Sequence, residues 1–266
     1  DHSKVLRCGS SDAKGSASNI GLIDSSYNLV EECFTWGHGR YPIGITSTGD
    51  SRYNIIRKNV VRLDYTITHE PKSCYTNYHQ SWNFFFNNLC IDSAAEVYYP
   101  GTEESNQVPS GFMTSNGFYD LTYRGNIVLN HAGNGYLLEG SDSHDIVLHN
   151  NVAWDVKRGG ILLVNDLDLA LFYFSTSNLD PTEYTFDLEH FTMGNVEGGT
   201  CFDAKESQPP LVDVTNSIFY NVDSRTGRPA LSGDFESNFN AFFMNDDDRG
   251  PAPYGSNDSS EALGNG

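Results

Sequence analysis

A pattern of eleven residues recurs along the chain and constrains its fold more than any other feature. It reads NIIRKNVVRLD at residues 54–64. It returns at 28–38, 120–130, 145–155, 185–195, 211–221 and 235–245, and with one residue fewer at 83–92. The eight starts lie 26, 29, 37, 25, 40, 26 and 24 residues apart. A repeat of this period is typical of solenoids, in which each unit packs on the next.

The repeats contain short runs of β-branched and aromatic residues. Two such runs lie within the pattern, as at 55–57 and 60–62, and a third run follows a glycine at 135–139 and 160–164. Three short strands in about 25 residues predict one coil of a parallel β-helix. We therefore predict an all-β fold, a single parallel β-helix of about eight coils. The alternative is a β-sandwich whose strands happen to be evenly spaced.

Asparagine recurs in phase with the pattern, which favours the β-helix over the sandwich. The sixth position holds Cys33, Asn59, Asn88, Gly125, Asn150, His190, Asn216 and Asn240. The last position holds His38, Asp64, Asp92, Asn130, Asp155, Asn195, Asn221 and Asn245. Asparagines stacked at one corner can hydrogen-bond the backbone of the next coil. These hydrogen bonds offset the cost of about 1–3 kcal/mol for burying each polar group without a partner. We therefore predict an asparagine ladder.

The spacing of the repeats sets the expected domain organisation. The long intervals predict insertions near 93–111 and 165–184 within a β-helix that spans residues 1–245. Residues 246–266 are rich in Asp, Gly, Ser and Pro and are expected to form a loop-rich C-terminal tail. We expect no amphipathic helix, because no segment shows the required apolar spacing.

The composition limits the classes of partner. The net charge of −19 and the pI near 4.5 argue against nucleic acid, which needs a basic surface. The most apolar stretch, 161–174, is interrupted by Asp166 and Asp168, so we expect no membrane insertion. A surface rich in Asn, Ser, Thr and Tyr suits an extracellular or cell-surface protein.

The repeat resembles the right-handed parallel β-helix of the pectate-lyase-like superfamily, over roughly residues 28–245. Members of that superfamily carry an asparagine ladder between the second and third strands of each coil. The resemblance implies that the strand after the glycine faces a substrate groove flanked by long turns. Polysaccharide lyases, glycoside hydrolases, adhesins and phage tailspikes share the fold, so the fold alone does not decide the function.

Candidate catalytic residues lie beside the strand at 161–164. Lys157 and Arg158 precede it, and Glu139 ends the preceding post-glycine strand. A lyase needs a base and a positive charge against the substrate carboxylate. Asp155 and Asp166 offer oxygens for calcium. The alternative is that these are ordinary charges of a solvated turn.

Candidate substrate-binding residues lie on the insertions and on the groove floor. Tyr98, Tyr99 and Tyr173 lie in the two insertions, where aromatic rings suit sugar faces. Alternation places Asp203 on the same outward face as Glu139, about 10 Å away over two coils. The alternatives are rings that fill the core of their own loops and acids that form a solvated face.

The cysteines lack the spacing of zinc or haem motifs. Cys8 precedes Cys33 by 25 residues, which is one coil length, so we expect stacked sulfurs and predict a disulfide between them. The alternative is a pair of buried thiols.

Taken together, these patterns predict an extracellular protein that interacts with a polysaccharide or surface glycan. If it is an enzyme, it is a polysaccharide lyase or glycoside hydrolase that uses the groove, with calcium as the expected cofactor. The alternative is a non-catalytic structural or adhesive protein of a cell surface, filament or virion. Such a protein would assemble end to end through its open coil ends.

Overall fold

The computed structural model describes most of the repeating part of the chain. The described residues are 2–11, 18–37, 41–46, 49, 51–64, 73–78, 80–94, 110–115, 119–131, 133–138, 144–156, 161–164, 185–197, 202–205, 211–223, 231–232, 236–243 and 259–260. Within these ranges the regular structure consists of strands, and no residue is helical.

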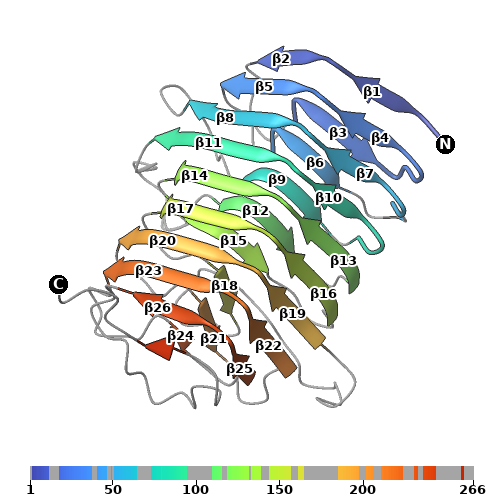
Figure 1. Cartoon of the computed structure of the whole chain (residues 1–266). Coiled ribbons are helices and arrows are strands. Elements are labelled where there is room, and N and C mark those ends of the chain that lie inside the picture. Colours follow the sequence, from blue (N-terminus) through green and yellow to red (C-terminus); the bar gives the residue numbers. More distant parts are fainter. Residues whose placement is uncertain are drawn as a thin grey trace, which may run out of the picture.

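The strands form three sheets that run the length of the molecule (Figure 1). Sheet A has nine strands in the order β1 (Lys4–Leu6), β4 (Leu29–Glu31), β7 (Ile55–Arg57), β10 (Phe84–Phe86), β13 (Tyr119–Arg124), β16 (His144–His149), β19 (Thr185–Glu189), β22 (Leu211–Thr215) and β25 (Glu236–Asn238). Neighbouring strands pair in parallel, as β13 does with β16.

Sheet B follows sheet A within each coil. It has ten strands in the order β2 (Gly9–Ser11), β5 (Phe34–Gly37), β8 (Val60–Asp64), β11 (Leu89–Ala94), β14 (Ile127–His131), β17 (Val152–Val156), β20 (Thr192–Glu197), β23 (Ile218–Asp223), β26 (Ala241–Phe243) and β27 (Ser259–Ser260). The last strand pairs in parallel with β26, so two residues of the predicted tail belong to the sheet.

Sheet C completes each coil. It has eight strands, which run in chain order as β3 (Ile20–Ile23), β6 (Ile43–Thr46), β9 (Ser73–Tyr78), β12 (Ser110–Ser115), β15 (Asn134–Leu138), β18 (Ile161–Val164), β21 (Phe202–Lys205) and β24 (Leu231–Ser232). Three parallel sheets visited in turn are a parallel β-helix, and the predicted fold and coil number are confirmed. Both predicted insertions lie largely or wholly outside the described residues.

The corner between sheets A and B holds the asparagine ladder. Asn88 Oδ1 accepts two hydrogen bonds from Asn59, one from the backbone N–H of Asn59 at 3.1 Å and one from its side-chain Nδ2 at 3.0 Å. Asn126 accepts the same two bonds from Asn88, and Asn151 from Asn126. The ladder residues in chain order are Cys33, Asn59, Asn88, Asn126, Asn151, Phe191, Ser217 and Asn240. The ladder is confirmed, and its buried amides are hydrogen-bonded.

The predicted phase of the ladder is wrong by one residue in the middle copies. Gly125, Asn150, His190 and Asn216 precede the ladder residues instead of forming the ladder. All four have positive φ, between 51° and 66°. Asn and Gly favour this left-handed conformation, so two adjacent corner positions both favour asparagine for different reasons. A Cβ on Gly125 would also lie 2.3 Å from Asn87 Oδ1.

The core is formed by inward side chains that stack from coil to coil. Phe112 lies between Tyr75 and Tyr136, with ring centroids 4.6 Å and 5.0 Å away. Tyr75 Oη lies 2.9 Å from the carbonyl oxygen of Asn59, and Tyr136 Oη donates to that of Asn126 at 3.1 Å. These hydroxyls connect sheet C to the ladder corner across the core. Each stacked pair contributes about 0.5–1.5 kcal/mol beyond its buried area.

Candidate functional site

The post-glycine strands of the predicted groove belong to sheet C, and Asp203 is in register with Leu137, two residues before Glu139 in the chain, instead of with the predicted Glu139 position. Leu137 pairs with Leu162, and Leu162 pairs with Asp203, so the three positions form one column across β15, β18 and β21. The position of Asp203 in this column follows from the backbone pairing of β21 with β18. The other groove residues lie outside the described residues, and these are Glu139, Lys157, Arg158, Asp166, Tyr98, Tyr99 and Tyr173.

The expectation of an open groove floor along this column is wrong in the central coils. Leu137 and Thr76 are fully buried, and Met113 is 6% exposed, although they alternate with core residues such as Tyr136. Both faces of sheet C are therefore covered at β9, β12 and β15. These outward-pointing side chains are therefore not accessible to a ligand.

Asp155, a predicted calcium ligand, is exposed at the end of strand β17. Its φ is +54°, and its Oδ1 accepts a hydrogen bond from Asn195 Nδ2 at 2.9 Å. Asn195 Oδ1 in turn accepts from Asn221 Nδ2 at 2.8 Å. These residues form an outer row of carboxylate and amide groups at the last position of the sequence pattern. The partner predicted for Asp155, Asp166, is outside the described residues, so the calcium site stays a prediction.

The predicted disulfide between Cys8 and Cys33 is absent, since both are free thiols. They do occupy stacked positions, because the Cys8 N–H donates to Cys33 Sγ at 3.4 Å. Burial, and then the hydrogen bond to Cys33, raise the pKa of Cys8 to about 11. The Cys8 thiol is therefore protonated at neutral pH, and only thiolates attack to form disulfides.

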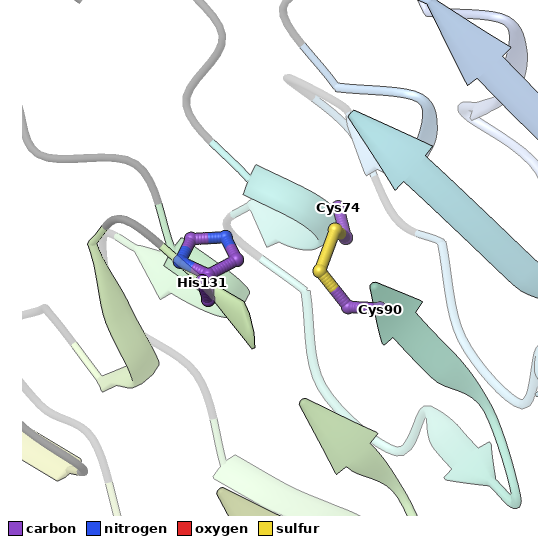
Figure 2. Close-up of side chains that lie close together, drawn as sticks. All are labelled: Cys74, Cys90 and His131. Carbon is purple, nitrogen blue, oxygen red and sulfur yellow. A yellow bond between two sulfur atoms is a disulfide. The ribbon is translucent and has the colours of Figure 1, made fainter. Parts of the chain in front are cut away.

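A different disulfide joins Cys74 on β9 to Cys90 on β11, with Cα atoms 5.9 Å apart. Sequence reasoning missed it, because a separation of 16 residues is not a coil length. The bond links sheet C back to the sheet B strand that follows it in the chain. His131, at the end of β14, lies beside this disulfide (Figure 2).

The two sulfurs and a His131 ring nitrogen lie within 4.8 Å of one another, and all three residues are fully buried. Nδ1 of His131 accepts the backbone N–H of Gly133 at 3.1 Å, and Nε2 has no hydrogen-bond partner. Burial lowers the pKa of His131 to about 3, so the ring is neutral. We name these three residues the sulfur–imidazole site.

The outer face of sheet A carries ionisable side chains from adjacent coils. His149 Nε2 lies 2.9 Å from Asp187 Oδ2 and 3.7 Å from Glu189 Oε2. Asp213 is in register with Asp187 on the next strand, and Arg124 is in register with His149 on the preceding one. The side chains of His149, Asp187 and Glu189 are 28%, 41% and 34% exposed, so ligands can reach them. We call these five residues the carboxylate–imidazole cluster.

Aromatic rings border the same sheet in the preceding coils. Tyr27, Tyr53 and Trp82 each occupy the corner before a sheet A strand, with φ between 51° and 62°. Successive centroids are 5.0 Å and 5.9 Å apart, and His2 and Tyr119 extend the row at its two ends. Arg52 packs over the Trp82 ring at 4.5 Å. We call this row the aromatic ladder.

The cluster has the groups that general acid–base chemistry needs. Neighbouring strands are about 4.8 Å apart, which sets the backbone spacing of Asp187 and Asp213. Alternate residues of one strand, such as Asp187 and Glu189, are about 6.6 Å apart. These are backbone separations, and they are of the same order as the roughly 5–9.5 Å between the paired carboxyl groups of glycoside hydrolases. Sequence reasoning missed the cluster because it assigned function to the post-glycine strand. A signal was present, since TFDLE at 185–189 and LVDVT at 211–215 place acidic residues at alternating, outward-facing positions.

No protein-family model matches the chain, and no curated protein matches its sequence. Among solved structures, the chain is similar to the catalytic domain of a GH87 α-1,3-glucanase variant in complex with nigerose, with a TM-score of 0.48 and 9% sequence identity. The match covers 98% of this chain and 58% of that chain, so this chain spans a little over half the length of that structure. Within the described residues, no helix has the length and apolar character needed to cross a membrane.

Proposed function

We propose that the protein is an extracellular carbohydrate-interacting β-helix whose glycan-binding face is the outer face of sheet A. The observation that carries the proposal is that two features with suitable chemistry border the same sheet. The aromatic ladder lies where strands β1 to β13 begin, and the carboxylate–imidazole cluster lies toward the ends of β13, β16, β19 and β22. The rings and the cluster therefore occupy different columns of one sheet, with Tyr119 five residues before Arg124 on β13.

The aromatic ladder has the chemistry that a polymeric polar ligand requires. Tyr27 and Tyr53 are 52% and 39% exposed. Because the rings stack on one another, they present their edges and hydroxyls outward, which suits hydrogen bonding to sugar hydroxyls. Five ring positions at about 4.8 Å per coil extend over roughly 20 Å, which matches an extended chain better than a small molecule.

If the protein is catalytic, the cluster favours hydrolysis over elimination. Glycoside hydrolysis uses two carboxyl groups, one as an acid and one as a base or nucleophile. Asp187, Glu189 and Asp213 supply carboxylates on neighbouring strands, and His149 holds Asp187 in place. A lyase would instead use the predicted Lys157 and Arg158 beside sheet C, with calcium at Asp155 and Asp166.

The test is binding and turnover on a panel of neutral glucans and uronate-containing polysaccharides. We expect retardation of the wild-type chain in affinity gels, and at least tenfold weaker binding for Tyr53→Ala and Trp82→Ala. Trp36→Ala on the outer face of sheet B is the matched control. No retardation by any polysaccharide, or equal loss in the control, would count against the proposal.

The catalytic arm separates the two candidate faces. New reducing ends that disappear in Asp187→Asn but persist in Asp203→Asn would assign hydrolysis to sheet A. An unsaturated uronate product that is lost in Lys157→Ala, in Arg158→Ala or on removal of calcium would assign elimination to the sheet C groove. Binding without any product would leave a non-catalytic glycan binder.

A second candidate function is a structural or adhesive protein that associates with copies of itself. The observation that favours it is the apolar outer face of sheet B, where Phe34, Trp36 and Ile218 are 42%, 42% and 47% exposed. Light scattering at several concentrations tests it. Concentration-dependent growth of the particles, weakened by Trp36→Ser, is the expected result, and a constant monomer mass would exclude it.

A further inference from the structure

The sulfur–imidazole site contains an unused ligand group among fully buried residues. His131 Nε2 is fully buried and has no hydrogen-bond partner, although a buried polar atom without one costs about 1–3 kcal/mol. The other ring nitrogen is occupied by the Gly133 N–H. Figure 2 shows the imidazole turned toward the two sulfurs.

Cysteine and histidine side chains are of the types that bind a soft divalent metal ion. Thiolate sulfur and imidazole nitrogen are the preferred ligands of zinc, with bonds of about 2.3 Å and 2.0 Å. Such bonds place tetrahedral ligand atoms roughly 3.5–3.8 Å apart. The three ligand atoms already lie within 4.8 Å of one another, so a small separation of the sulfurs reaches this geometry. These three residues would fill three of the four positions of a tetrahedral site.

We infer that reduction of the Cys74–Cys90 bond converts the sulfur–imidazole site into a Cys₂His site for a soft divalent ion, with Zn²⁺ as the fitting ion. A dithiol reductant supplies two electrons and two protons, which break the S–S bond and give two thiols while the reductant becomes a disulfide. The ion then binds both sulfurs and displaces the two thiol protons. The disulfide form and the metal form exclude each other.

The hydrogen bond between His131 and Gly133 predicts how the imidazole ring changes when a metal ion binds. Because Nδ1 accepts from Gly133, the neutral ring carries its proton on Nε2. Metal binding through Nε2 moves that proton to Nδ1, with no change in the charge of the ring. The Gly133 N–H then loses its acceptor. Each ion bound therefore releases two protons, both from the thiols.

The experiment uses the full chain with Cys8→Ser, Cys33→Ser and Cys201→Ser, which leaves Cys74 and Cys90 as the only thiols. Serine is an acceptable ladder residue, since Ser217 Oγ accepts the Phe191 N–H at 3.0 Å. The chain is reduced with a phosphine and titrated with Co²⁺. We expect one ion per chain, a sulfur-to-cobalt charge-transfer band, displacement by Zn²⁺, and release of two protons per ion.

The variants decide which groups bind. Cys74→Ser should abolish the charge-transfer band or halve it, and His131→Ala should weaken binding at least tenfold. His131→Phe, which keeps a ring in the core, repeats the test if the alanine variant does not fold. Far-ultraviolet circular dichroism must show that the reduced chain keeps its sheet signal.

Three results would overturn the inference. They are equal binding by the oxidised chain, no charge-transfer band in the folded reduced chain, and binding that does not depend on His131. A chain that binds Co²⁺ only after losing its sheet signal would also count against it. None of these results bears on the glycan-binding face of sheet A.

Discussion

Cys33 Sγ accepts the backbone N–H of Cys8 at 3.4 Å, in the place where an asparagine oxygen accepts the equivalent bond in the next coils. The same sulfur lies 3.8 Å from the Val5 carbonyl oxygen. In the following coil, Asn59 Nδ2 donates to the equivalent carbonyl, that of Val30, at 3.0 Å. Cys33 is therefore a sulfur-containing end of the asparagine ladder.

Replacing this sulfur with an amide should stabilise the protein. Cys33→Asn offers an oxygen to the Cys8 N–H and an Nδ2 to Val5 O and Asn59 Oδ1. A hydrogen bond of this kind contributes about 1 kcal/mol, which raises Tm by roughly 2–4 °C in a chain of this size. Thermal unfolding followed by circular dichroism measures it, with Cys33→Ala as the control that should lower Tm. A lower Tm for the asparagine variant would show that the corner has no room for an amide.

A central residue of the ladder should be far less tolerant. Asn88→Ala leaves the buried N–H of Asn59 without its acceptor and removes the Nδ2 bond to Ile56 O at 2.8 Å. We expect a loss of about 2–4 kcal/mol in the free energy of unfolding. Denaturant unfolding measures it.

The matched control for Asn88→Ala is Asn130→Gly. Asn130 is an exposed amide with a φ of +50°, which glycine adopts without strain. This variant should change the unfolding free energy by less than about 1 kcal/mol. Equal losses at the two sites would contradict the view that the buried ladder, and not amides in general, stabilises the coils.

Gly194 provides space for two rings on the outer face of sheet B. Trp154 and Tyr220 stack with centroids 5.6 Å apart, one strand to either side of it. A Cβ at Gly194 would lie 2.2 Å from Trp154 Cζ3, so Gly194→Ala should displace the rings and cost about 1–3 kcal/mol.

The control is Gly9→Ala, because a Cβ there would lie 3.5 Å from Trp36 Cζ3, an ordinary contact. Near-ultraviolet circular dichroism should change for Gly194→Ala and stay constant for Gly9→Ala. If both variants behave alike, the stacked pair does not depend on the missing Cβ.

An ion-pair group on sheet A should make stability depend on pH. The hydrogen bond from Arg57 at 2.8 Å, and then that from Lys58, hold the pKa of Glu31 below its usual value. A lowered carboxyl pKa contributes stability above the unfolded pKa, and this stability is lost as the pH falls through the folded pKa.

Glu31→Gln should therefore lower Tm at pH 7, and the difference from wild type should shrink as the pH falls below about 4.5. Added salt at pH 7 should shrink it as well, since the pair is near the surface. Melting curves over this pH range measure the effect. A Tm difference that is constant across the range would show that the ion pair does not contribute.

The fold could be predicted from the sequence because successive coils repeat the same types of outward-facing residue as well as the same types of core residue. Asn59 and Asn88 fell in the correct phase, whereas Gly125 and Asn150 were assigned to the ladder one residue early. The error arose because the left-handed corner residue and the ladder residue next to it both favour asparagine.

The candidate site was harder to predict, because it depends on which face of each sheet is open. Alternation placed Leu137 outward correctly, but alternation cannot show that the position is covered. The contacts of His149 with Asp187, and of His131 with the Cys74–Cys90 bond, join residues on different coils or sheets. A periodic pattern gives register along a strand and does not give such lateral contacts.

The proposal that the outer face of sheet A binds glycans is tested most directly by single-tryptophan reporters. The chain has three tryptophans, Trp36, Trp82 and Trp154, and only Trp82 belongs to the aromatic ladder. A variant that keeps Trp82 alone, with phenylalanine at the other two positions, is titrated with neutral and uronate polysaccharides while its fluorescence is followed. We predict a saturable change for at least one polysaccharide, and no change when Trp36 alone is kept. A response from Trp36 with none from Trp82, or no response from either, would contradict the assignment of sheet A as the glycan-binding face.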